Sequence, residues 1–347
     1  MSPRFNQGVV AKPGTSHNCF VPDMRMIEAV RAAITEEMER DERVLVLGED
    51  VGKKGGVFGA TDGLYARFGE ARVLDTPLAE SAIVGVAIGA ALNGMLPIAE
   101  IQFADFIHPA FDQIVSEAAR TRYRSNGDWG VPMVIRAPFG GGVHGGLYHS
   151  QSIEAFYAHV PGLKVVVPSM PADAHGLLKS AVRDPDPVLF LEHKKVYRLV
   201  TEDVPDGDHL VPIGPAVVRR EGGNLSCFAW GLMTHYCLEA AQQLDPEGVS
   251  VEVVDLRTLA PLDRATILES VRKTGKAMVV YEDNLTGGFG AEVAAIISEH
   301  AFDSLDGPVV RVAAPDIPAM PFNGPQEEFF MPSPAKIAEA MRKLAAY

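Results

Sequence analysis

Apolar residues recur at two different spacings along this chain, and the two spacings alternate. In residues 24–40, apolar side chains such as Met26, Val30 and Ile34 share one face of a predicted helix that Asp23 can cap. Afterwards, near-continuous apolar runs alternate with helical patterns. The runs predict strands over 43–48, 96–103, 132–137, 163–168 and 188–192, and the patterns between them predict helices over 80–95, 109–124 and 171–183. Such strands, joined through helices, indicate a parallel sheet covered on both faces.

The alternation lapses in an acidic stretch that contains Pro and Gly, residues 201–215, and then resumes. Further strands are predicted over 225–229, 249–255, 277–282 and 309–312, and further helices over 234–244, 263–274, 290–302 and 334–346. We therefore predict an α/β protein of two domains, because one core rarely extends over a chain of this length. Its parts are an irregular arm (1–22), a larger domain (23–200), a linker (201–215) and a smaller α/β domain (216–347).

Charge and cysteine content limit the possible partners and compartments. The 347 residues carry a formal net charge of −14, whereas nucleic acids and anionic membranes attract basic surfaces, so we expect neither as a partner. A basic protein partner is compatible with this charge. The three cysteines, Cys19, Cys227 and Cys237, form no disulfide framework and fit a reducing compartment. Without a signal-like segment or an apolar run of membrane-spanning length, the sequence predicts a cytoplasmic protein.

The most informative single residue is Glu80. A strand-like run ends at Asp75-Thr76-Pro77, and Glu80 follows at the start of a helix rich in small residues. A lone acid with small and apolar neighbours suggests a group that handles a proton in a sheltered site. Alternatively, Glu80 only favours the positive end of its helix, as acids of the first turn often do.

A second candidate is the loop 140–152, which reads Gly-Gly-Gly-Val-His-Gly-Gly-Leu-Tyr-His-Ser-Gln-Ser. It follows a predicted strand, at the edge where open α/β sheets bind ligands. Its five glycines allow close approach of a ligand, and His144 and His149 can change charge near neutral pH. A flexible surface loop with solvated histidines would have the same composition, and both interpretations stay open.

Two further segments have weaker signals. Gln102, Phe103 and Phe106 end the strand expected beside Glu80, where an amide and an aromatic ring could hold a flat heterocycle. On spacing alone, packing of both phenylalanines in the core is the more common outcome. The segment 286–292 superficially resembles a dinucleotide-binding loop but lacks its glycine spacing, so we interpret it as a tight helix start.

Six short motifs, in this order, resemble one known family. They are Leu47-Gly48-Glu49-Asp50-Val51, Asp75-Thr76-Pro77-Leu78-Ala79-Glu80, Ala99-Glu100-Ile101-Gln102-Phe103-Ala104-Asp105, Arg122-Tyr123-Arg124-Ser125, Tyr148-His149-Ser150-Gln151-Ser152 and Asp255-Leu256-Arg257-Thr258-Leu259. From about residue 23 onward, the chain is similar to the β subunits of thiamine-diphosphate-dependent 2-oxo acid dehydrogenases, the decarboxylating first component. The resemblance is closest to the branched-chain (2-oxoisovalerate) members. It implies a transketolase-like fold, with a parallel-sheet pyrimidine-binding domain and a smaller α/β C-terminal domain.

The resemblance also implies roles for individual residues. Glu80 matches the acid that shares a proton with the aminopyrimidine of thiamine diphosphate and so activates the cofactor. Glu49, Leu78 and Gln102 match residues that line the pyrimidine pocket. Phe106 stands where the family commonly has Tyr, so it retains ring stacking but not a hydroxyl contact. His149 matches a proposed proton donor that guides the lipoyl group during acyl transfer.

The absence of one motif predicts a partner. The family holds Mg²⁺ and the diphosphate through a Gly-Asp-Gly motif, which this chain lacks, so we expect no Mg²⁺ ligand here. The resemblance implies an α subunit that supplies these ligands in an α₂β₂ heterotetramer. It also implies a C-terminal domain that docks the dihydrolipoyl acyltransferase core. The family can bind K⁺ through backbone carbonyls, which here would belong to Val131, Met133, Val134, Ala181, Asp184 and Asp186.

The leading prediction is oxidative decarboxylation of branched-chain 2-oxo acids with acyl transfer to a lipoyl group. A pyruvate or acetoin dehydrogenase β subunit is the alternative within the family. Tyr148 favours the branched-chain type, whereas Ile153 and His108 depart from its usual residues. Two other classes are less favoured. A non-catalytic assembly module would not need both Glu80 and His149, and a nicotinamide oxidoreductase would need the missing glycine motif.

Overall fold

The computed structural model describes residues 23–205 and 207–347, so the predicted arm 1–22 lies outside the described residues. Its first sheet has seven strands in the order β12-β6-β7-β5-β4-β2-β3. Their bounds are β2 Val44–Gly48, β3 Val73–Asp75, β4 Leu96–Glu100, β5 Val134–Phe139, β6 Lys164–Val166, β7 Val188–His193 and β12 Thr258–Ala260. All neighbouring pairs are parallel except β6 and β12. The predicted parallel sheet is therefore confirmed.

Both faces of this sheet are covered, as the continuous apolar runs predict. Along β2, Val44 and Val46 belong to one core cluster, whereas Leu45 and Leu47 belong to another. The first cluster also holds buried residues of α1 Met26–Arg40 and α6 Pro171–Val182, and the second holds those of α3 Glu80–Leu92. Because successive strand residues point to opposite faces, the inner strands β2, β4, β5, β6 and β7 each contribute to both clusters.

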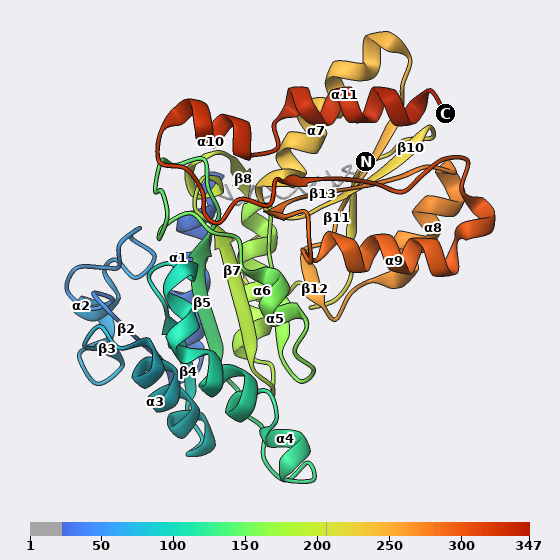
Figure 1. Ribbon diagram of the computed structural model, residues 1–347. Coiled ribbons are helices and arrows are strands. Elements are labelled where there is room, and N and C mark those ends of the chain that lie inside the picture. Colours follow the sequence, from blue (N-terminus) through green and yellow to red (C-terminus); the bar gives the residue numbers. More distant parts are fainter. Residues whose placement is uncertain (1–22, 206) are drawn as a thin grey trace, which may run out of the picture.

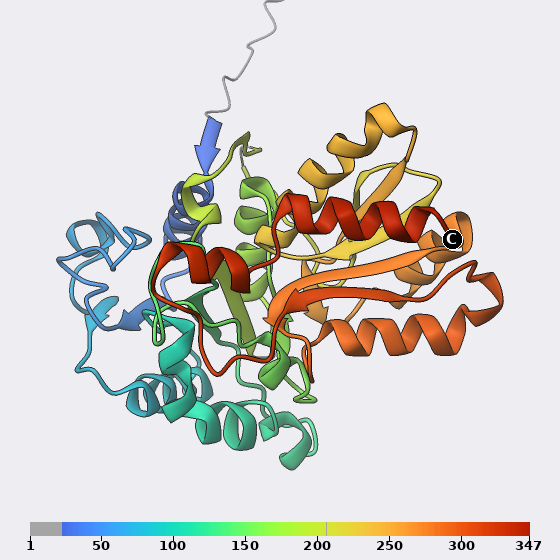
Figure 2. The ribbon, with the colours of Figure 1, turned by 45° about the horizontal axis from the view of Figure 1, so that its top comes forward.

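A second sheet of five strands, β14-β13-β10-β11-β9, stands beside the first, as Figures 1 and 2 show. Its strands are β9 Val217–Arg220, β10 Leu225–Ala229, β11 Val251–Asp255, β13 Ala277–Asn284 and β14 Val310–Ala314. Only β9 runs antiparallel to its neighbour. Four helices cover its faces: α7 Leu232–Leu244, α8 Arg264–Thr274, α9 Gly290–His300 and α11 Pro334–Ala345. The shorter helices of the chain are α2 Leu64–Phe68, α4 Thr121–Arg124, α5 Glu154–Ala158 and α10 Gly324–Phe330.

Several local predictions were wrong. The helix predicted over 109–124 is instead a 3₁₀ helix (Ala104–Ala110), a π-helical turn (Gln113–Ala118) and the short α4. Pro109 lies inside the first of these pieces, where it lacks an N–H to donate. Asp23 does not cap α1, because it lies in strand β1 Asp23–Arg25 and Arg25 occupies the cap position.

Long-range pairing also joins segments that the sequence separates. The predicted linker 201–215 begins with β8 Thr201–Asp203, which pairs antiparallel with β1. Strand β12 follows β11 of the second sheet along the chain, yet it pairs with β6 of the first sheet. The first sheet therefore includes residues from both halves of the chain. No helix within residues 23–205 and 207–347 is long and apolar enough to cross a membrane.

Candidate active site

The predicted site residues gather at the carboxyl edge of the first sheet. Glu49 follows β2, Glu80 follows β3, Gln102 follows β4, and the Gly/His loop 140–152 follows β5. These four strands are neighbours in the order β5-β4-β2-β3. The next strand of the chain, β3, lies on one side of β2, and the strand after it, β4, lies on the other side. The chain therefore reverses its direction across the sheet here, and the carboxyl edge between β2 and β4 is a topological switch point. Open α/β sheets bind ligands at such points.

Glu49 and Glu80 lie close enough for their charges to interact. Burial, followed by the nearby charges of Asp50 and Glu80, raises the pKa of Glu49 above its usual value. Glu80 is the first residue of α3, as predicted, but it is only half-buried. Within the part of the chain that the structure describes, the shelter that we expected for this acid is therefore incomplete. Leu78, two residues earlier, is 71% exposed.

Gln102 connects the end of β4 with the end of β2. Its Nε2 lies 3.4 Å from both the backbone oxygen of Glu49 and Oδ2 of Asp50, which are long hydrogen bonds. Asp50 itself has a positive φ of 59°, which turns the chain sharply after β2. Because both hydrogen bonds are long, the side-chain amide of Gln102 can exchange them for stronger hydrogen bonds to a ligand. Gln102 therefore fits the edge of a polar heterocycle.

His149 packs in an aromatic cluster beside Gln102. Its ring centroid lies 4.5 Å from that of Phe103 and 5.3 Å from that of Phe106, both in edge-to-face geometry. The Gly/His loop thus folds back onto the end of β4. Both phenylalanines are only partly buried, so their rings are not fully enclosed in the core. The second predicted histidine, His144, lies on the outer part of the same loop, where it is exposed.

Three charged residues at this edge were not predicted as site residues. Asp105 accepts a hydrogen bond from the backbone N–H of Gln151 at 3.2 Å. Glu282 accepts one from Gly141 N at 2.5 Å, although it belongs to β13 of the second sheet. Burial lowers the pKa of Lys194 to about 8, although the negative charges of Asp105 and Glu282 act to raise it. Asp105 ends the motif 99–105, one of the six that resemble the family. No local sequence pattern marks Glu282 or Lys194 as a site residue.

The residues present fit half of a thiamine diphosphate site. A carboxylate, an amide and aromatic rings match the hydrogen-bonding edge and the flat faces of an aminopyrimidine. No group of three or more His, Cys, Asp or Glu side chains within residues 23–205 and 207–347 has the geometry of a metal site.

The six residues predicted to bind K⁺ lie at or just before the start of β5 and at or just after the end of α6. The backbone oxygen of Met133 already accepts from Val188 N at 3.0 Å, and that of Ala181 accepts from Asp184 N at 3.3 Å. A carbonyl oxygen has a second lone pair, so these bonds leave K⁺ binding possible. A cavity of about 440 Å³ adjoins the two segments, and its lining includes Arg40, Arg43, Arg122 and Arg183. Each of these four arginines forms an ion pair with a carboxylate, and Asp184 also lines the cavity.

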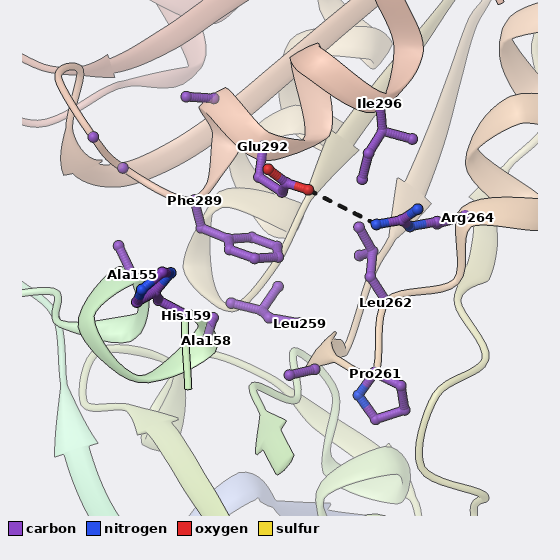
Figure 3. Close-up of a pocket in the computed structure, with 14 residues that line it drawn as sticks. Ala155, Ala158, His159, Leu259, Pro261, Leu262, Arg264, Phe289, Glu292 and Ile296 are labelled. Atoms are coloured by element: carbon purple, nitrogen blue, oxygen red, sulfur yellow. Dashed lines mark ion pairs between the residues drawn. The ribbon is translucent and has the colours of Figure 1, made fainter. Parts of the chain in front are cut away.

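A separate cavity of about 630 Å³ lies between the first and second sheets. Figure 3 shows Ala155, Ala158 and His159 on one side and Phe289, Glu292 and Ile296 on the other. Arg264 and Glu292 approach each other across its rim at 3.9 Å. Its lining includes none of the predicted site residues. The segment 286–292, which superficially resembles a nucleotide loop, therefore contributes to this cavity and not to the edge that carries Glu80.

Comparison with known proteins agrees with this geometry. Residues 23–200 match the family described as "Transketolase, pyrimidine binding domain", and residues 214–337 match "Transketolase, C-terminal domain". A solved "Split gene transketolase, inactive beta4 tetramer" superposes with a TM-score of 0.75 at 26% identity, covering 94% of this chain and 99% of that one. Fold and site thus define a transketolase-like protein with the pyrimidine-binding half of a thiamine diphosphate site.

Similarity to individual proteins identifies the family more closely. The chain is 60% identical over 324 residues to the 2-oxoisovalerate dehydrogenase subunit beta of Bacillus subtilis (strain 168), covering 93% of this chain and 99% of the relative. It is 50% identical over the same length and coverage to the pyruvate dehydrogenase E1 component subunit beta of that organism. It is 49% identical over 325 residues to the mitochondrial 2-oxoisovalerate dehydrogenase subunit beta 2 of Arabidopsis thaliana, covering 93% and 90%. The chain belongs to the family of 2-oxo acid dehydrogenase β subunits.

Proposed function

We propose that this chain is the β subunit of a branched-chain 2-oxo acid dehydrogenase, acting in decarboxylation and in acyl transfer to a lipoyl group. One observation carries the choice of substrate. The chain is 60% identical to a 2-oxoisovalerate dehydrogenase β subunit but 50% identical to a pyruvate dehydrogenase β subunit of the same organism. A pyruvate dehydrogenase β subunit remains the second candidate, because this relative is covered to the same extent.

The site residues have separate roles in this proposal. Thiamine diphosphate, when bound, supplies the electron sink that makes decarboxylation of a 2-oxo acid possible. Glu80 holds a proton against the ring nitrogen N1′ of the aminopyrimidine. Gln102 and Glu49 orient that ring, while Leu78 and Phe106 contact its faces. His149 holds a proton at the acyl-transfer step. Because Glu80 is half-buried and Leu78 is exposed, the partner subunit must cover both to exclude water.

The proposed assembly is an α₂β₂ heterotetramer. Its α subunit supplies the Mg²⁺ ligands and the diphosphate site, since this chain has no Gly-Asp-Gly motif. The C-terminal domain docks a dihydrolipoyl acyltransferase core, and K⁺ binds to the backbone of Val131, Met133, Val134, Ala181, Asp184 and Asp186. Absence of K⁺ from the purified, active complex, measured by elemental analysis, would contradict the K⁺ proposal.

Substrate preference tests the proposed function directly. The chain is co-expressed with the α subunit that co-purifies with it from its source, and the complex is assayed with thiamine diphosphate and Mg²⁺. We expect 3-methyl-2-oxobutanoate to give a higher kcat/KM than pyruvate. A clear preference for pyruvate would favour the second candidate. If calorimetry detects no binding of thiamine diphosphate to the complex, the chain is instead an assembly module.

A further inference from the structure

The loop that carries His149 is covered by a segment from the other end of the chain. Residues 320–327, which end in the first turn of α10, form this cover segment; in Figures 1 and 2, α10 lies beside the loop after β5. Met320 packs against Gly141, and Gly324 approaches His144. A Cβ atom added to Gly146 would come within 3.0 Å of the ring of Phe322. The segment therefore follows the loop closely over several residues.

Glu327 joins the cover segment to the loop by hydrogen bonds. Its side chain is almost fully buried, and its Oε1 accepts from Gly142 N at 2.9 Å and from His144 N at 3.1 Å. Its Oε2 lies 2.6 Å from Nδ1 of His144. Asn323 caps α10 through Gln326 N, which fixes the helical turn that presents Glu327. One carboxylate thus satisfies two backbone N–H groups and one side chain of the loop.

These contacts hold a backbone conformation that is otherwise unfavourable. His144 has a φ of 56°, in the left-handed region that residues other than glycine seldom adopt. Such a conformation persists only where surrounding contacts determine it. Without Glu327, two partly buried N–H groups would lose their acceptor, and residue 144 would be free to return to an ordinary conformation.

The loop transmits this constraint to His149 over a short distance. A Cβ atom on Gly145 would come within 2.7 Å of the backbone oxygen of His149, so the two backbones touch. His149 N donates to the oxygen of Gly146 at 3.4 Å. The two ends of the loop are fixed separately, since Glu282 binds Gly141 N and Asp105 binds Gln151 N. Glu327 therefore controls the middle part of the loop, the part that contacts the backbone of His149.

We propose that Glu327 is a positioning residue for His149, through which the C-terminal part of the chain fixes the geometry of acyl transfer. This inference rests on the proposed function, because it assumes that His149 acts in transfer to a lipoyl group. The effect of Glu327 passes through Gly142 and His144, which its carboxylate contacts. A displacement of about 1 Å in a reacting group can lower a rate on the order of a hundredfold.

Two assays on the assembled α–β complex separate positioning from folding. Decarboxylation is measured with an artificial electron acceptor, and acyl transfer is measured by reductive acylation of a lipoyl domain. We expect Glu327→Ala to lower acyl transfer on the order of tenfold or more beyond any loss in decarboxylation. Glu327→Gln should restore most of the transfer rate, because its amide oxygen still accepts from both backbone N–H groups. The matched control is Glu328→Ala, an exposed neighbour on the same helix, which should change neither rate.

His149→Ala serves as the reference that separates the two proposals. If His149→Ala lowers both rates equally, the proposed role of His149 in transfer fails. If His149→Ala lowers transfer selectively but Glu327→Ala lowers both rates equally or neither, only the positioning proposal is overturned. Should Glu327→Ala prevent assembly, Glu327→Asp carries the test, because its shorter side chain cannot reach both N–H groups. A Glu327→Asp complex with an unchanged ratio of the two rates would also overturn the proposal.

Discussion

Glu80 and Glu292 both lie in the first turn of a helix, yet their surroundings differ. Glu80 begins α3 next to Glu49, whose pKa is raised by burial and by the charges of Asp50 and Glu80. Glu292 is exposed on α9, and its nearest charge is that of Arg264 at 3.9 Å. A favourable interaction with the helix dipole applies to both acids. Only Glu80 has a second acid beside it at the carboxyl edge of the first sheet.

At this scale, we expect Glu80→Gln to lower decarboxylation by a factor on the order of 10² to 10⁴, because the amide cannot share a proton with the cofactor. Assembly with the α subunit should not change, since the two side chains have nearly the same shape. The measurement is kcat with an artificial electron acceptor, together with size-exclusion chromatography. Glu292→Gln is the matched control and should retain full activity. A Glu80→Gln complex with most of its activity would show that this acid does not activate the cofactor.

At the scale of elements, a buried ion network joins three neighbouring strands below the site. Arg136 of β5 donates to Glu100 of β4 at 2.6 Å and, through two nitrogens, to Glu192 of β7 at 2.6 Å. Tyr197 donates to the same Glu192 at 2.6 Å. Burial raises the pKa of Glu100, although the positive charge of Arg136 acts to lower it. The network keeps the carboxyl ends of these strands, and hence Gln102 and the Gly/His loop, in register.

We therefore expect Arg136→Met to destabilise the protein by about 3–5 kcal/mol, because it leaves two buried carboxyl groups without their cation. Arg342→Met is the matched control. Arg342 makes a similar two-nitrogen pair with Glu247, but this pair lies at the surface, where water screens the two charges, so its loss should have little effect on stability. Urea unfolding of the full-length protein measures both variants. Equal losses for the two variants would mean that the buried network contributes no more than a surface pair.

At the scale of the whole molecule, acids from both halves of the chain meet where the two sheets adjoin. Glu154 of α5 accepts a hydrogen bond from Trp230 at 3.0 Å, and its other oxygen is buried without a partner among the described residues. Burial, then the charge of Asp283 on β13, raises the pKa of Glu154 to about 8. Burial and the charge of Glu282 raise the pKa of Asp283 to about 6. Folding thus favours the protonated form of both groups.

The sign of the pH dependence follows from these raised values. The stabilisation from protonated Glu154 is complete below the ordinary pKa of 4.5 and is lost as the pH rises through about 8. We expect the free energy of unfolding to fall by roughly 1–3 kcal/mol between about pH 6 and about pH 9 in the unmodified protein. Glu154→Gln should remove most of this fall, because the amide cannot ionise and can still accept from Trp230.

Urea unfolding over this pH range provides the measurement, with Glu339→Gln, an exposed acid on α11, as the control that should keep the fall. The same pH dependence in the protein with and without Glu154→Gln would contradict the assigned role of this acid.

Local patterns in the sequence predicted most of the helices and strands and the residues at the strand ends. Burial on two faces requires nearly continuous apolar runs, and these can be recognised without the fold. Glu80, Gln102 and the loop 140–152 could therefore be placed at the ends of strands, whereas Glu49 was assigned to the site only through the family resemblance. Pro109 and the π-helical turn after it were not recognised, because short irregular helices have no clear period.

Only the tertiary structure decided which distant segments meet. The pairing of β12 with β6, the hydrogen bonds from Gly141 to Glu282 and from Gly142 to Glu327, and the meeting of Glu154 with Asp283 all join residues more than 80 positions apart. A periodic pattern reports whether a side chain is buried, but not which remote side chain lies against it. The sequence by itself therefore determined the sheets and the family of the site. Chain packing decided that carboxylates from the C-terminal part of the chain hold the loop that carries His149.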